Sequence, residues 1–193
     1  MIKSHYLALC LALTAMRMAE LPLEIGAPIP KSDQALKDIS GKEITLNKAK
    51  QANGLLVMFS GNDCPYIERN KARTVEICRY AITNQIGVVL INSNANASID
   101  AMRAYASSQQ YTWYYVADPA AAIAEAFQAA HTPECYLFNA GGTLVYKGAI
   151  DDSPGNADAV KTRHLNNAIN DLLAKKTPKV NSTQVLGCNI KRF

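Results

Sequence analysis

Several features are scarce in this sequence of 193 residues. It contains only three histidines, His5, His131 and His164, and its formal net charge is +4. Histidines this far apart do not have the spacing of a metal site, so no metal is expected. A charge this small gives no reason to expect nucleic-acid binding. The sequence also lacks an internal repeat.

Long hydrophobic runs are also rare. The run at residues 7–16 is shorter than the about 20 residues that a membrane-spanning helix needs. Lys3 precedes it and small residues follow it, which is the order of a secretory signal. We therefore expect residues 1–19 to be a signal peptide or a retained N-terminal anchor, with cleavage after Ala15 or Ala19 both open. The protein is then exported, to the periplasm or another extracytoplasmic site.

The rest of the chain has the composition of one folded domain. With 49% hydrophobic and 19% charged residues, the chain can bury one sizeable core. We place this domain at residues 20–174 and a polar C-terminal tail, without clear periodicity, at residues 175–193.

Hydrophobic spacing predicts alternating strands and helices. Ser98 and Asp118 are expected helix caps, with Pro119 in the first turn after Asp118. The expected elements are a hairpin at 38–46, strands at 55–59, 86–91, 113–116, 134–139 and 143–149, and helices at 64–83, from 98, at 118–129 and at 157–174. This order predicts an α/β fold with a mixed central sheet and helices on both faces.

Cys64 is the most informative residue. It follows the apolar run 55–59 and precedes Pro65 and a helical stretch. A thiol at the start of a helix lies beside unpaired N–H groups and the positive dipole end, which stabilise the nucleophilic thiolate. A small buried hydrophobe is the alternative, since most free cysteines behave that way.

Three further cysteines lie outside the expected signal: Cys78, Cys135 and Cys188. Outside the cytoplasm, such thiols can keep disulfides. If one helix carries both Cys64 and Cys78, they lie about 21 Å apart and cannot bond. Sequence alone leaves the other pairings open.

Several separated motifs together resemble the thioredoxin-fold redoxins. More narrowly, they resemble the peroxiredoxin-like group of the alkyl hydroperoxide reductase and thiol-specific antioxidant family. The resemblance covers roughly residues 21–192 and implies a three-layer α/β/α sandwich with an N-terminal hairpin. Its motifs are Gly26-Ala27-Pro28, the 38–46 hairpin, Cys64-Pro65, Thr132-Pro133-Glu134, residues 148–154 and the ending Gly187-Cys188-Asn189-Ile190-Lys191.

The resemblance also implies a substrate site. It predicts that Pro133 is cis and that the backbone at Thr132 lies beside Cys64, where an extended substrate chain could pair with it. Pro65 belongs to the same predicted site. His131 precedes this loop, so we expect it to approach the site, where an imidazole could move a proton near neutral pH.

The sequence departs from the family pattern at Gly61. Relatives commonly carry a second cysteine at this position, and typical peroxiredoxins carry a threonine there. Glycine supplies neither a thiol nor a hydroxyl. Asp63 adds a negative charge beside Cys64 that opposes thiolate formation. Arg69 and Arg73 are expected to be solvated charges.

A dithiol mechanism therefore needs a second thiol from elsewhere. Cys188 is the first candidate, because a flexible tail can fold back and because its Gly-Cys setting matches the family ending. Cys135 and an external thiol are the alternatives, and an inert Cys188 stays open.

The expected function is a thiol-dependent oxidoreductase, acting in redox homeostasis or as an antioxidant. Cys64 would attack a disulfide or a peroxide, and Cys188 would resolve the product. The partners would be protein or small-molecule thiols, disulfides or peroxides and a thioredoxin-like reductant, with no organic cofactor. The alternative is a redox-inactive thioredoxin-fold module that binds a peptide beside Pro133.

Overall fold

The structure is a computed structural model that describes residues 23–192. The predicted signal peptide or anchor at residues 1–19 lies outside the described residues. Within residues 23–192, no helix combines the length and the apolar character that crossing a membrane requires.

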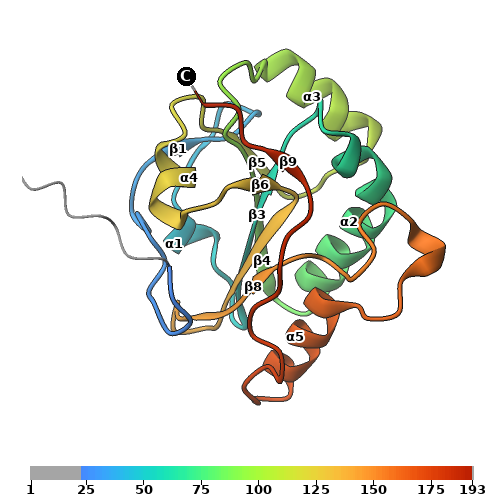
Figure 1. The fold of residues 1–193 in the computed structure, drawn as a ribbon. Helices are drawn as coiled ribbons and strands as arrows, with labels where there is room; N and C mark the ends of the chain where they lie inside the picture. The colour runs from blue at the N-terminus through green and yellow to red at the C-terminus, as the bar shows by residue number, and fades with distance from the viewer. Residues whose placement is uncertain (1–22, 193) are drawn as a thin grey trace, which may run out of the picture.

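Five strands form the central sheet, in the spatial order β5-β4-β3-β7-β8 (Figure 1). Strands β3, β4 and β5 run parallel to one another, whereas β7 and β8 are antiparallel to their neighbours. The predicted mixed sheet is confirmed. The strands are β3 (Gly54–Ser60), β4 (Ile86–Asn92), β5 (Tyr114–Ala117), β7 (Glu134–Phe138) and β8 (Leu144–Gly148).

The central position of β3 explains its continuous apolar sequence. All seven of its residues are buried. Val57 and Phe59 face a core shared with α1 (Leu46–Ala49) and α4 (Ala122–Phe127). Leu56 and Met58 face the opposite core, which the other helices cover, and this alternation is the period of a strand. Those helices are α2 (Pro65–Thr83), α3 (Ile99–Ser108) and α5 (His164–Leu173).

Helices on both faces make the molecule a three-layer α/β/α sandwich, as predicted. The N-terminal hairpin is also confirmed, with β1 (Leu36–Lys37) antiparallel to β2 (Glu43–Ile44). Its turn contains Gly41 at φ 89°, a conformation that side chains disfavour. The Asp38 carboxylate accepts hydrogen bonds from the Ser40 and Tyr115 amides, and the second of these ties the hairpin to β5.

Two predicted helices have different bounds. The helix expected at 118–129 begins only at Ala122 and ends at Phe127. The Asp118 carboxylate still accepts hydrogen bonds from the Ile123 and Ala124 amides, but across an intervening turn that contains Pro119. The capping role of Asp118 was thus recognised, and the position of the helix start was wrong.

The helix expected at 157–174 is two separate elements. A short 3-10 helix, η1 (Ala157–Ala159), is followed by an irregular stretch before α5 begins at His164. Asp152 reaches back to this stretch: its amide donates to the Thr162 carbonyl, and its carboxylate accepts from the Lys161 amide. Backbone hydrogen bonds from Thr162 and Lys161 to the Asp152 carboxylate hold its pKa below the usual value. The contacts of Asp152 with residues 161 and 162 take the chain out of helical geometry.

Three short elements were not predicted. Helix α1 starts at Leu46, where the hairpin was expected to end, because the Thr45 hydroxyl caps the Lys48 amide. In the tail, β9 (Cys188–Asn189) pairs antiparallel with β6 (His131–Thr132). The tail therefore crosses the domain as a docked strand (Figure 1).

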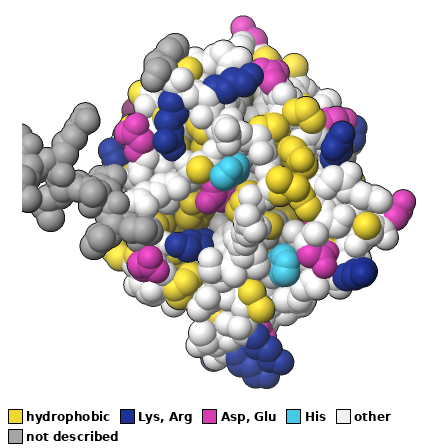
Figure 2. Space-filling view, in the orientation of Figure 1, with side chains coloured by type: hydrophobic (Ala, Val, Ile, Leu, Met, Phe, Trp, Pro, Cys, Tyr) yellow, Lys and Arg dark blue, Asp and Glu magenta, His cyan; other side chains and the backbone are white. Residues whose placement is uncertain are grey.

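Charges of both signs are interspersed on the face that Figure 2 shows. Acidic and basic side chains alternate around its rim, and hydrophobic side chains gather nearer the middle. No extended basic field lies on this face of the described residues, in keeping with the small net charge.

Candidate active site

Three loops meet at the carboxyl end of β3. Residues 61–64 continue β3, and residues 93–96 continue β4, whose Asn92 pairs with Ser60. Residues 131–133 lead into β7, whose Glu134 pairs with Phe59. Sheet register thus brings together segments that lie far apart in the sequence, and Cys64 sits among them.

Cys64 occupies the N-cap position of α2, directly before Pro65 in the first turn. Its carbonyl accepts the Glu68 amide at 3.2 Å, while its side chain makes no capping hydrogen bond. The sulfur therefore takes no part in capping, and the amino end of a 19-residue helix lies beside it. In the dithiol state this end favours the thiolate over the thiol.

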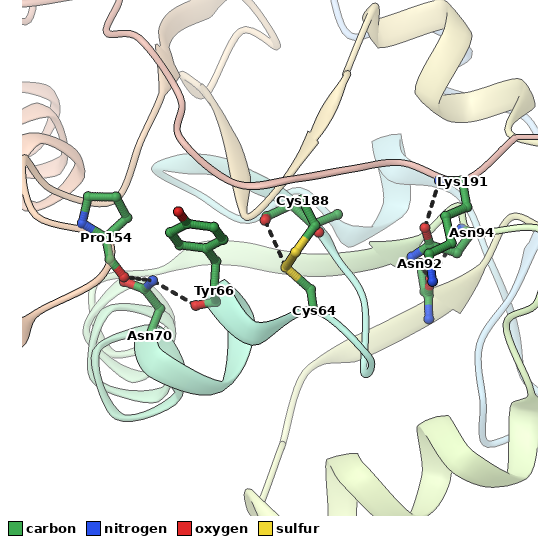
Figure 3. Close-up of a disulfide and its surroundings, with 9 residues drawn as sticks. Cys64, Tyr66, Asn70, Asn92, Asn94, Pro154, Cys188 and Lys191 are labelled. Carbon is green, nitrogen blue, oxygen red and sulfur yellow. Dashed lines mark hydrogen bonds between the residues drawn. A yellow bond between two sulfur atoms is a disulfide. The ribbon is translucent and has the colours of Figure 1, made fainter.

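The structure joins Cys64 to Cys188 in a disulfide (Figure 3), with the two Cα atoms 5.9 Å apart. This is the pairing that the family resemblance favoured. Cys64 is buried, with 6% of its surface exposed, whereas Cys188 is half-buried. The more accessible sulfur of the pair is therefore that of Cys188.

The two other described cysteines are free thiols in the core. Cys78 lies inside α2 and Cys135 inside β7, and neither has any exposed surface. Burial raises the pKa of both thiols well above the usual value. Cys135, the alternative partner for Cys64, is a free thiol on β7, where its backbone pairs with that of Met58.

The loop before β7 lies directly against the disulfide. The Thr132–Pro133 peptide bond is cis, as the resemblance predicted. The Thr132 carbonyl oxygen lies 3.3 Å from the Cys64 sulfur, so it can accept a hydrogen bond from the Cys64 thiol in the dithiol state. The backbone of His131 pairs with Asn189, and its amide donates to the Glu134 carboxylate.

The tail docks along this loop through its backbone. Thr132 pairs with Cys188, and the Ile190 amide donates to the Ala130 carbonyl at 2.9 Å. Gly187 is required by close approach, because a Cβ there would overlap the Thr132 carbonyl. Ile190 is buried in the core, and the Arg192 guanidinium donates to the Ala129 carbonyl. These contacts do not involve the sulfur atoms.

Asn94 provides a further contact to the tail that sequence reasoning missed. Its side-chain oxygen accepts the Lys191 amide at 2.8 Å, and the Lys191 carbonyl accepts the Ala95 amide. The Asn94 side-chain nitrogen donates to the side-chain oxygen of Asn92 at 2.9 Å (Figure 3). A signal for this residue did exist, because loops that follow adjacent parallel strands meet at one edge of a sheet.

A second loop borders α2 on the opposite side of the disulfide (Figure 3). The Asn70 side chain donates to the carbonyls of Tyr66 and Pro154, both at 2.7 Å. Arg73 forms an ion pair with Asp151 and donates to the Ser153 carbonyl.

The expectation that Arg73 is a solvated charge was wrong: its side chain is 16% exposed, and that of Asp151 only 2%. Burial of the Asp151 carboxylate makes the nearby guanidinium its ion-pair partner. Arg69 is exposed, with its guanidinium carbon 5.8 Å from the centre of the Tyr66 ring.

A cavity of about 210 Å³ opens at the disulfide. Both sulfur-bearing residues line it, together with Asp63, Pro65, Asn94, Thr132 and Lys191. Another hollow of similar volume lies between α2 and the 150–163 region and is lined by neither cysteine of the pair. Residues 23–192 contain no group of three or more potential metal-ligating His, Cys, Asp or Glu side chains.

Comparison with known proteins identifies the fold and the family. A search of curated proteins gave no match. A conserved protein of uncharacterized function from Geobacillus kaustophilus is 27% identical with a TM-score of 0.81, covering 88% of this chain and 92% of that one. A hypothetical protein from Sinorhizobium meliloti 1021 is 28% identical with a TM-score of 0.81, covering 90% and 97%.

A cysteine-to-serine mutant of PrxQ from Xylella fastidiosa shares the fold, at 16% identity and a TM-score of 0.62, covering 79% of this chain and 97% of that chain. The sequence profile of the AhpC/TSA family matches residues 25–147. The chain therefore belongs to the AhpC/TSA family and is a thiol-dependent oxidoreductase with a thioredoxin-like fold.

Proposed function

We propose that this protein is a dithiol–disulfide oxidoreductase whose redox couple is Cys64 and Cys188. The observation that carries the proposal is the disulfide between a cysteine at a helix N-terminus and a cysteine on a docked tail. The tail keeps its own hydrogen bonds to Ala129, Ala130 and Thr132. It therefore keeps the Cys188 thiol near Cys64 when the disulfide is reduced.

Exposure favours Cys188, rather than Cys64 as expected from the sequence, as the sulfur that exchanges with a partner. An external thiolate attacks the half-buried Cys188 sulfur, the Cys64–Cys188 bond breaks, and Cys64 leaves as a thiolate stabilised by α2. A second thiol of the partner then attacks the mixed disulfide and leaves Cys188 reduced. Two electrons pass from the partner dithiol to the protein, and the same steps in reverse pass them from the protein dithiol to a partner disulfide.

The docked tail argues against the peptide-binding alternative. An extended peptide would need the backbone at His131 and Thr132, and β9 already pairs with both residues. Main-chain pairing at a strand edge admits one strand on each side. An extended partner chain must therefore displace residues 188–189 before it can bind there.

Disulfide exchange suits the site better than peroxide reduction. Cleavage of a peroxide is helped by a donor that stabilises the leaving oxygen. Gly61 has no hydroxyl, and the guanidinium of Arg73 is engaged by Asp151. The natural reductant in this proposal is a thioredoxin-like dithiol, and residues 1–19 support an extracytoplasmic location.

Single cysteine-to-serine variants test this proposal. Each reduced variant and the wild type are mixed with glutathione disulfide and mapped by mass spectrometry over time. We expect wild type to form the Cys64–Cys188 bond with release of two glutathiones. Cys64→Ser should form a mixed disulfide at Cys188 at least about tenfold faster than Cys188→Ser forms one at Cys64, because Cys64 is less exposed.

Three outcomes count against the proposal or a part of it. If wild type remains a dithiol in excess glutathione disulfide, no redox couple exists, and the binding-module alternative takes its place. If Cys64 forms the mixed disulfide faster than Cys188, the couple stands but the assigned entry point is wrong. If the reduced wild type consumes added hydrogen peroxide faster than either single variant does, peroxide reduction is favoured.

A further inference from the structure

Three residues from separate segments meet beside the disulfide. They are Gly61 between β3 and α2, Asn94 on the loop after β4, and Lys191 on the tail. We infer that Asn94 is the positioning residue that holds Cys188 against Cys64, and that its position depends on glycine at residue 61. This inference rests on the proposed function, because it concerns the stability of the Cys64–Cys188 bond.

Asn94 contacts both the domain and the tail with one side chain. Its nitrogen donates to Asn92 at the end of β4, and its oxygen accepts the Lys191 amide. The Asn94 amide also donates to the Asn92 side chain at 3.2 Å, so the loop is tied to the strand. With the Ala95–Lys191 backbone bond, this fixes the tail three residues beyond Cys188.

The Asn94 side chain fills the space that a side chain at residue 61 would occupy. A Cβ at residue 61 would lie 2.6 Å from the Asn94 side-chain nitrogen and 3.9 Å from the Asn92 side-chain oxygen. The backbone at Gly61 does not have the positive φ that requires glycine. The constraint is therefore steric, and any larger residue displaces the Asn94 side chain.

This displacement weakens the hold on the tail. When the Asn94 side chain moves, the Lys191 amide loses its acceptor, and an amide hydrogen bond contributes about 1 kcal/mol, or about fivefold in an equilibrium constant. Ile190 and Arg192 still contact the domain, so the tail remains docked for part of the time. The effective concentration of Cys188 at Cys64 falls accordingly.

The same geometry links glycine at residue 61, where the sequence departs from the family pattern, to the location of the second thiol, Cys188, on the tail. A cysteine or threonine at residue 61 and Asn94 in its present position exclude each other, because both need the same space. The absence of a side chain at residue 61 and the docking of the Cys188 tail are therefore coupled features of one site.

The test is a double-mutant cycle on the disulfide equilibrium. Wild type, Asn94→Ala, Gly61→Ala and the double variant are equilibrated in buffers of reduced and oxidised glutathione, and the disulfide fraction is counted by mass spectrometry. Asn94→Ala and Gly61→Ala should each lower the equilibrium constant for the disulfide about fivefold. The double variant should match Asn94→Ala, because the Cβ then meets no side-chain nitrogen.

Asn167→Ala, an exposed site on α5, is the matched control and should stay within twofold of wild type. Urea unfolding of each reduced variant checks folding separately. The inference is overturned if the equilibrium constant for Asn94→Ala stays within twofold of wild type. It is also overturned if the effects of the two substitutions add in the double variant. If wild type itself forms no disulfide at any glutathione ratio, it is the proposed function that fails.

Discussion

The four described cysteines form two pairs at different depths of the molecule. Cys64 and Cys188 lie at the carboxyl edge of the sheet and are bonded, whereas Cys78 and Cys135 lie in one core cluster and are free. Cys64 precedes a helix, while Cys78 lies within that same helix. The redox pair therefore differs from the structural pair in its position at a helix end, in the exposure of Cys188 and in the docked tail that brings Cys188 to Cys64.

The largest expected effect is the loss of the redox couple in Cys188→Ser. This variant should lose all reversible uptake of two electrons from dithiothreitol, because Cys64 then has no second thiol in reach. Thiol counting before and after reduction measures the loss. Cys135→Ser is the matched control and should keep the full exchange; its failure to do so would move Cys135 into the mechanism.

Slow alkylation in the native protein should also distinguish the core thiols, Cys78 and Cys135, from the redox pair. Burial raises the pKa of Cys78 and Cys135, so their thiolates are absent between pH 7 and pH 9. Iodoacetamide should label them at least about 100-fold more slowly in the native protein than in urea, with no increase towards pH 9. Rapid native labelling of Cys78, followed by peptide mapping, would contradict their assignment to the core.

Gly187→Ala should produce an effect of intermediate size. The new methyl group overlaps the Thr132 carbonyl, so β9 must move away from β6 and Cys188 from Cys64. We expect the equilibrium constant for the disulfide against glutathione to fall about tenfold. Gly155→Ala is the control, since a Cβ there meets only the end of the Arg69 side chain at 3.8 Å.

The smallest expected effect concerns stability alone. Cys78→Ala removes a buried sulfur from the core and should lower the free energy of unfolding by about 1–2 kcal/mol. Urea unfolding of the reduced protein measures this loss. The disulfide equilibrium should stay within twofold of wild type, and a larger change would mean that core packing at α2 controls the redox pair.

The sequence predicted the parts of the fold that depend on local pattern. Periodicity or turn chemistry predicts the apolar run in β3, the start of α2 directly after Cys64 and the Gly141-Gly142 turn between β7 and β8. The sequence did not predict the break between η1 and α5, because this break depends on hydrogen bonds of Asp152 with Lys161 and Thr162, nine and ten residues further along the chain.

The residues of the site also divide into those that the local sequence pattern predicted and those that it did not. The place of Cys64 between a strand and a helix predicted its role, whereas Cys188 was proposed from the family resemblance and from the expectation that the tail folds back. Asn94 was missed, since only the tertiary structure brings the loop after β4 to Lys191. Arg73 was misjudged because nothing near it in the sequence identifies the buried Asp151 as its partner.

The most direct test of the central claim is non-reducing peptide mapping by mass spectrometry of the mature protein, before and after a stoichiometric oxidant and again after dithiothreitol. The account predicts that the oxidant joins Cys64 to Cys188, that dithiothreitol reverses the bond, and that Cys78 and Cys135 remain thiols throughout. A Cys64 that stays free, or that bonds to Cys135, would contradict it.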